Sequence, residues 1–221
     1  MKSAKKAPVG QDAAPTQNSQ SSATGSSISY SADHLANQFL IAMAGLADPN
    51  FAGSVIYLFE HTERGAMGLV INRPTELDMA ALFEKIEVKL EAAPISSQPV
   101  YYGGPVQIER GFVLHKPTAE VLYSSSLAVP GGLTMTTSKD ILEAVAVGAG
   151  PNQFLMTLGY AGWSAGQLEE EITLNDWMNV PLSQEQMIDI IFNTPYSQRY
   201  ERTMSYLGFD PSHLSGEAGH A

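Results

Sequence analysis

The chain has 221 residues, of which 44% are hydrophobic, so it is long enough for one domain with a full core. It contains no cysteine, which excludes disulfides, thiolate catalysis and cysteine-based metal sites and fits a reducing compartment. The formal net charge is −11; the first thirty residues hold three lysines and one aspartate, so the rest of the chain carries −13. A domain with this negative charge repels the phosphates of nucleic acids. The sequence also has no basic stripe and no zinc-finger spacing, so direct binding of nucleic acid is disfavoured.

Residues 1–30 are rich in Ser, Ala, Gln, Thr and Gly and almost free of large apolar side chains. They cannot bury enough surface to offset the entropy of ordering, so we predict a disordered tail. We find no apolar segment typical of a secretory signal and none long enough for a membrane helix. We therefore expect a cytoplasmic protein without a membrane partner, whose single domain spans residues 31–221.

The first half of the domain reads as strands followed by a helix. Apolar runs predict strands at 39–43, 54–59 and 66–71, and the last two form a hairpin whose loop carries His61. Pro74 ends the third strand because it lacks a ladder donor. Asp78 is predicted to cap a helix that ends near residue 86.

The second half alternates short strands and helices. Strands are predicted at 100–102, 111–115 and 153–158, together with a hairpin over 127–135 that turns at Pro130-Gly131-Gly132. Helices are predicted after capping boxes at Thr137/Asp140 and Ser183/Gln186, and a final helix covers about 197–207. This irregular order indicates the α+β class rather than a doubly wound sheet.

The stretch Gly162-Trp163-Ser164-Ala165-Gly166 lies between a predicted strand and a short acidic helix. We interpret Ser164 as the N-cap of that helix, with Gln167 completing a capping box. The same letters also form a G-x-S-x-G string, which is typical of a nucleophile elbow. In that alternative Ser164 is the nucleophile of a serine hydrolase, Asp176 (or Asp189 or Asp210) the acid and His213 (or His220) the base. We favour the structural interpretation, because the glycines loosen the junction that an elbow needs to be sharp.

Several separated strings resemble one family, the AlgH/YqgE proteins. They occur in the family's order and cover most of the chain after the tail: residues 39–43, 65–74, 103–106, 110–115, 158–163, 166–169 and 218–221. The resemblance implies a compact domain with a bifurcated, mixed or antiparallel sheet that includes a small closed barrel. It implies no established activity and no cofactor, although members carry the label of transcriptional regulators. In this family the position of Ser164 is not reliably a serine, which argues against a nucleophile.

The candidate binding residues lie at strand ends and turns. Arg73, next to Asn72, could bind a carboxylate or phosphate through its fork, or could pair with one of the many acids. Gly103 and Gly104 could let the backbone approach a ligand, or could serve a turn. His61, His115, Trp163 and Gln167 complete the candidate set. Neither histidine has metal-ligand spacing to a second one, so no metal site is expected.

If these strand ends converge, they form a shallow polar depression that binds a small anionic ligand or a partner peptide. Our preferred hypothesis is therefore a non-enzymatic binding or regulatory protein whose effect on transcription is at most indirect. The alternatives are a serine hydrolase using Ser164 and a DNA-binding transcriptional regulator.

Overall fold

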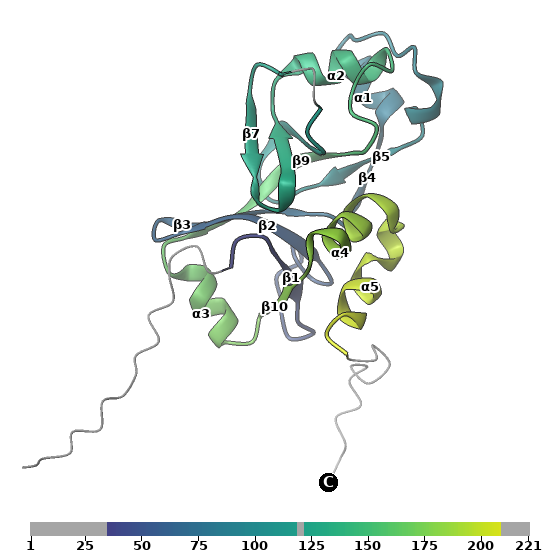
Figure 1. The fold of residues 1–221 in the computed structure, drawn as a ribbon. Helices are drawn as coiled ribbons and strands as arrows, with labels where there is room; N and C mark the ends of the chain where they lie inside the picture. The colour runs from purple at the N-terminus through teal and green to yellow at the C-terminus, as the bar shows by residue number, and fades with distance from the viewer. Residues whose placement is uncertain (1–34, 119–121, 209–221) are drawn as a thin grey trace, which may run out of the picture. The chain divides into compact units, whose positions relative to one another are not determined.

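The computed structural model describes residues 35–118 and 122–208, within a compact unit that begins at Ser31 (Figure 1). The predicted tail over residues 1–30 lies outside the described residues. So do two of the predicted acid and base candidates, Asp210 and His213, and the alternative base His220.

Ten strands form the sheet of the described domain. They are β1 (Gln38–Ala42), β2 (Val55–Thr62), β3 (Gly65–Val70), β4 (Pro74–Asp78), β5 (Pro99–Tyr102), β6 (Val106–His115), β7 (Ser126–Val129), β8 (Leu133–Thr136), β9 (Phe154–Ser164) and β10 (Trp177–Pro181). The hairpins β2–β3 and β7–β8 are confirmed, although His61 lies in β2, paired with Ala66, rather than in the loop. Burial of β2 is also confirmed, since its residues from Val55 to Phe59 are all buried. The analysis of the sequence missed β4 and β10, because both are short edge strands without a long apolar run.

Five short α-helices are described: α1 (Met79–Lys85), α2 (Lys139–Ala146), α3 (Gln167–Thr173), α4 (Gln184–Ile188) and α5 (Arg199–Ser205). Between α4 and α5 lie a single π-helical turn, η3 (Asp189–Asn193), and a 3₁₀ turn, η4 (Tyr196–Gln198). Two further 3₁₀ turns are η1 (Ala93–Ile95) and η2 (Pro130–Gly132). No described helix is long and apolar enough to cross a membrane.

Of the four predicted N-caps, two are confirmed, and those at Thr137 and Ser164 are wrong. The Asp78 carboxylate accepts from the N–H of Ala81, and Ser183 with Gln186 forms a complete capping box. Helix α2 instead begins after Ser138, because the Asp140 carboxylate bonds to the Ser138 hydroxyl rather than to Thr137.

Strand β9 is the branch point of the sheet. Its first half pairs with the parallel strand β5 and its second half with the antiparallel strand β3, while β6 runs along its other edge. The sheet is therefore bifurcated and mixed, and the α+β class is confirmed. The expected closed barrel is not found among the described strands: the ladder ends at β10 and at β7, leaving a curled half-barrel.

Close backbone contact makes the branch possible. A Cβ at Gly103 would lie 2.2 Å from the carbonyl oxygen of Gly159, and one at Gly104 would lie 2.1 Å from the carbonyl carbon of Tyr160. Only glycine lets two main chains approach so closely. Both glycines thus have a structural use: Gly103 also bonds to the N–H of Val70 and to the carbonyl of Leu158.

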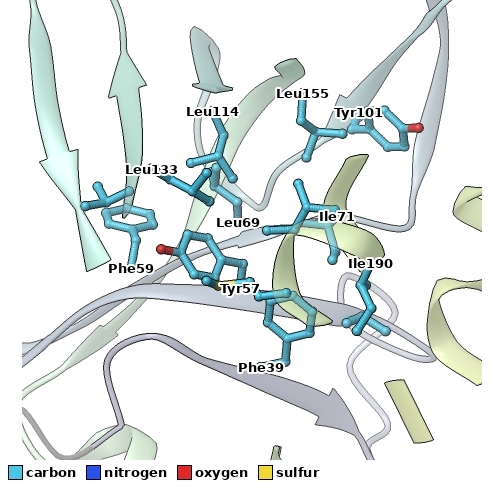
Figure 2. Close-up of a cluster of buried hydrophobic side chains, with 14 of the residues drawn as sticks. Phe39, Tyr57, Phe59, Leu69, Ile71, Tyr101, Leu114, Leu133, Leu155 and Ile190 are labelled. Carbon is cyan, nitrogen blue, oxygen red and sulfur yellow. The ribbon is translucent and has the colours of Figure 1, made fainter. Parts of the chain in front are cut away.

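The curled sheet separates three apolar clusters. The largest lies on one face, beneath α4, η3 and α5, and includes Phe39, Tyr57 and Leu114 (Figure 2). A second lies on the opposite face of β1–β3 under α3, and the third packs α1 and α2 against β5, β6 and β9 (Figure 1).

Candidate functional site

The turn containing Ser164 is built differently from both interpretations of the sequence. Strand β9 continues through Ser164, which pairs with Gly65 of β3. The N-cap of α3 is Gly166, in the left-handed conformation with φ of 76° and no side-chain capping bond, so the predicted serine cap is wrong. Only half of the predicted capping box exists: the side-chain oxygen Oε1 of Gln167 accepts from the Ser164 N–H at 2.9 Å.

Alternation along β9 decides where the Ser164 side chain points. Ala161 and Trp163 pack in the cluster under α3, whereas Tyr160 packs against the opposite core. Side chains alternate between faces along a strand, so Ser164 lies on the face away from α3. His61 lies on the α3 face, where its Nε2 contacts Glu169 at 2.8 Å.

No described residue completes a catalytic set with Ser164. Its hydroxyl is exposed and has no hydrogen-bond partner among residues 35–118 and 122–208, and His61 is on the other face of the sheet. Asp176 lies beyond the far end of α3, where its main chain bonds to Glu171 and Met43. His213 lies outside the described residues, so the part of the chain that the structure describes holds no serine–imidazole contact.

Trp163 packs in the core and is anchored by a carboxylate. One oxygen of Glu171 accepts from the indole N–H of Trp163 and from that of Trp177, each at 2.8 Å. Its other oxygen accepts from the Gln167 amide at 2.9 Å. Phe51 stacks on Trp163 with ring centroids 6.3 Å apart. These contacts hold α3 and the loop around Phe51 to the sheet.

Asn72 and Arg73 hold the same loop from its other side. The Asn72 amide bonds to the Val55 N–H and to the Gly53 carbonyl, each at 2.9 Å. Arg73 donates to the carbonyls of Pro49 and Asn50, and its guanidinium lies over the Tyr102 ring. Its described partners are therefore main-chain carbonyls and an aromatic ring, and no described acid forms an ion pair with it.

His115 is buried at the end of β6. Its Nδ1 lies 2.7 Å from the Lys116 carbonyl and must carry the proton, so its Nε2, 2.9 Å from the Thr136 hydroxyl, accepts in the neutral ring. Burial lowers the pKa of His115 below its ordinary value, although the bond to Lys116 opposes the change. Both nitrogens are satisfied inside the protein.

The predicted depression is thus only partly assembled. Asn72, Arg73 and Trp163 converge on the loop over residues 48–53: the Asn72 amide and Nη1 of Arg73 bond to that loop, and the indole of Trp163 bonds to Glu171. His115 contacts β8 and Tyr123 instead, in a different part of the sheet. The described residues hold no cluster of three or more His, Asp or Glu side chains that could bind a metal ion.

A different cavity, of about 200 Å³, lies between the starts of β5 and β9, the π-helical turn η3 and the start of helix α5. Its apolar lining residues are Phe154, Leu155, Met156, Ile191 and Phe192, with Pro99, and its polar lining residues are Gln98, Asn152, Gln153 and Tyr101. Figure 2 shows that the Tyr101 hydroxyl points away from the neighbouring buried side chains. We call this cavity the Arg199 pocket, after its one charged lining residue.

Arg199 is 4% exposed and has no carboxylate partner among the described residues. It donates through Nε to the Thr194 carbonyl at 3.0 Å and through Nη1 to the Ile71 carbonyl, and its guanidinium lies 5.0 Å from the Tyr101 ring centroid. Burial lowers the pKa of Arg199, and burial raises that of the Tyr101 hydroxyl, which the neighbouring guanidinium opposes. Buried charges are normally paired, so an arginine without an acid indicates a place for an anion.

The sequence analysis missed Arg199. It is one of two arginines, with Arg202, in a helix whose spacing does not tell which is buried. The contacts that bury it come from Ile71 and Thr194, and the first of these is 128 positions away. A π-helical turn such as η3 often occurs at functional sites, but nothing in the residues Asp189–Asn193 predicts one.

Comparison with known proteins gives one consistent result. The family DUF179, described as AlgH-like, matches residues 39–212. The UPF0301 protein RSc0675 of Ralstonia nicotianae is 63% identical over 188 residues, which cover 85% of this chain and 96% of that protein. The solution structure of the AlgH protein from Pseudomonas aeruginosa is 45% identical with a TM-score of 0.68, covering 92% of this chain and all of that one. Protein DIP2367 from Corynebacterium diphtheriae, at 21% identity and a TM-score of 0.57 over 76% of this chain and 84% of its own, shares the fold.

Proposed function

The chain belongs to the AlgH-like family, and from this premise we propose that it is a binding protein for a small anionic ligand rather than an enzyme. The names of its relatives state no reaction, so the proposal depends on the chemistry of this chain. The observation that carries it is Arg199, a buried guanidinium that lines a cavity and has no acid beside it. The cytoplasm is the compartment we predict, and any effect on transcription follows from ligand or protein binding.

The donors of Arg199 support this assignment. A guanidinium has five N–H donors, and the two bonds to main-chain carbonyls use Nε and one hydrogen of Nη1. Nη2 has no hydrogen bond to another described side chain or carbonyl, apart from the polar contact that the guanidinium makes with Tyr101. Two parallel N–H bonds to one anion are the geometry for which arginine is suited.

The proposal is tested by titrating the methyl-labelled protein with acetate and with inorganic phosphate, followed by NMR. With at least one of the two anions we expect saturable shifts of the Met156 and Ile191 methyl groups, since both residues line the pocket. Arg199→Met should weaken binding about tenfold or more, since hydrogen bonds to a charged group contribute about 1.5–3 kcal/mol each.

Two variants make that result specific. Arg202→Met is the matched control, because Arg202 lies in the same helix, is 48% exposed and bonds to Asp189. Arg199→Lys keeps the positive charge but loses the paired N–H donors of the guanidinium. This variant replaces Arg199→Met in the test if Arg199→Met does not fold. Equal affinity of wild type and both Arg199 variants, or no binding of any anion, would overturn the proposal.

The serine hydrolase is the second candidate, supported only by the G-x-S-x-G string. A fluorophosphonate probe should leave the wild type unlabelled, because no described imidazole reaches Ser164 to activate it. Labelling of the wild type that disappears in Ser164→Ala would favour the hydrolase instead.

A further inference from the structure

We propose that the Arg199 pocket selects a compact monocarboxylic acid with an apolar tail, in preference to dianions such as dicarboxylates and phosphate. This inference rests on the proposed function and gives its ligand a chemical class. It follows from three properties of the pocket: its charge, its lining and its volume.

The first property is charge. Arg199 contributes one positive charge, and none of the other residues that line the pocket is charged. A monoanion forms a neutral pair with the guanidinium. A dianion leaves a second negative charge without a partner in a buried site, which is strongly unfavourable. The chain's net charge of −11 adds repulsion in the same direction.

The second property is the chemistry of the lining. Its apolar residues are Phe154 and Phe192, which are half-buried, and Leu155, Met156 and Ile191, which are buried. The two half-buried rings are therefore the apolar surface that the tail of a ligand would contact. Each buried CH₂ group contributes about 0.8 kcal/mol, which corresponds to about fourfold in affinity. The amides of Gln98 and Gln153 can donate to the carboxylate.

The third property is size. A volume of about 200 Å³ corresponds to about seven groups of the size of a water molecule, at about 30 Å³ each. A four-carbon acid such as butyrate, with six non-hydrogen atoms, is of this size. Nucleotides and sugar phosphates would extend out of this volume and are multiply charged.

Three compounds of nearly equal length separate these properties. Butyrate carries one charge and an apolar end, succinate replaces that end by a second carboxylate, and butyramide removes the charge. Each is titrated into wild type, Arg199→Lys and Arg202→Met, with the methyl groups of Leu155, Met156 and Ile191 as reporters. The homologous acids from acetate to valerate measure the contribution of each CH₂.

We expect butyrate to bind wild type and Arg202→Met equally, and succinate and butyramide to bind at least about tenfold more weakly. Affinity should rise by up to about fourfold per CH₂ along the acids until the pocket is full. Arg199→Lys should lower butyrate affinity.

The failures are distinguishable. If succinate or phosphate binds as tightly as butyrate and depends on Arg199, the anion site stands but selection of a monoanion is wrong. If affinity does not rise along the homologous acids, the assignment of an apolar tail is wrong. If no anion in the series shifts the pocket methyl groups, the proposed function itself is wrong.

Discussion

At the scale of single residues, two histidines with similar positions in the sequence have different surroundings. Both lie near the end of a strand, and both are buried. His115 has a partner for each ring nitrogen, whereas His61 has Glu169 on Nε2 and no described partner on its buried Nδ1. The two arginines Arg73 and Arg199 also have different surroundings: Arg73 bonds to a loop, and Arg199 lines a cavity.

His115 makes folding sensitive to pH. Because burial lowers its pKa in the folded state, the folded protein keeps a neutral ring while the unfolded chain, with a pKa near 6.5, takes up a proton. Its contribution to stability is therefore complete above pH 6.5 and is lost as the pH falls through the folded pKa. Each unit of lowering corresponds to about 1.4 kcal/mol.

The measurement is urea unfolding of wild type and His115→Gln at several pH values. The series starts above the unfolded pKa of histidine, near 6.5, and ends above the range in which carboxylates titrate. We expect the free energy of unfolding to fall with acidification in wild type and to fall less in the variant. Parallel curves for the two proteins would show that His115 does not titrate on unfolding.

At the scale of elements, helix α3 illustrates how a seven-residue helix is held in place. Such a helix is too short to be stable alone. Leu168 packs against the sheet, Glu169 contacts His61, and Glu171 bonds to two indoles. The stability of the element thus comes from its tertiary contacts with β2, β9 and β10.

Replacing Glu171 tests this attachment. Glu171→Leu leaves the N–H groups of Trp163 and Trp177 buried without an acceptor, at a cost of about 1–3 kcal/mol for each. We expect the free energy of unfolding to fall by at least about 2 kcal/mol, measured by urea denaturation followed by tryptophan fluorescence.

Glu170→Leu is the matched control, because its side chain is exposed in the same helix. It should change stability by no more than about 0.5 kcal/mol. Similar costs for the two substitutions would mean that the indole contacts do not hold α3.

At the scale of the whole molecule, the net charge favours our proposal of a binding protein over a DNA-binding regulator. The net charge of the chain is −11, and the described α-helices are of five to eight residues. Affinity for DNA comes largely from lysine and arginine side chains, which bind phosphates and release their counterions. This chain has only 12 lysine and arginine residues, against 23 aspartate and glutamate residues.

We therefore expect the purified protein to pass through a duplex-DNA column at physiological ionic strength without retention, and to bind an anion exchanger. A basic DNA-binding domain run in parallel serves as the control. Retention that weakens steeply with added salt would support the regulator and contradict our preference.

The residue pattern alone determined the α+β class, the buried strand β2, two hairpins, and the caps at Asp78 and Ser183. These features depend on neighbours within a few positions, through strand alternation, turn chemistry and capping bonds. The family was also recognisable from strings in order along the chain, and comparison confirmed it.

Only the tertiary structure decided which polar residues are free to bind. Ser164 has no capping role because β9 continues to Ser164, six residues beyond the predicted end of the strand at residue 158, and Arg73 is bonded to a loop 23 positions away. Arg199 bonds to the carbonyls of Ile71, directly after β3, and Thr194, directly after η3, and its pocket joins segments from residue 98 to residue 199. Burial and pairing of a charge depend on such distant neighbours, so local patterns in the sequence do not contain them.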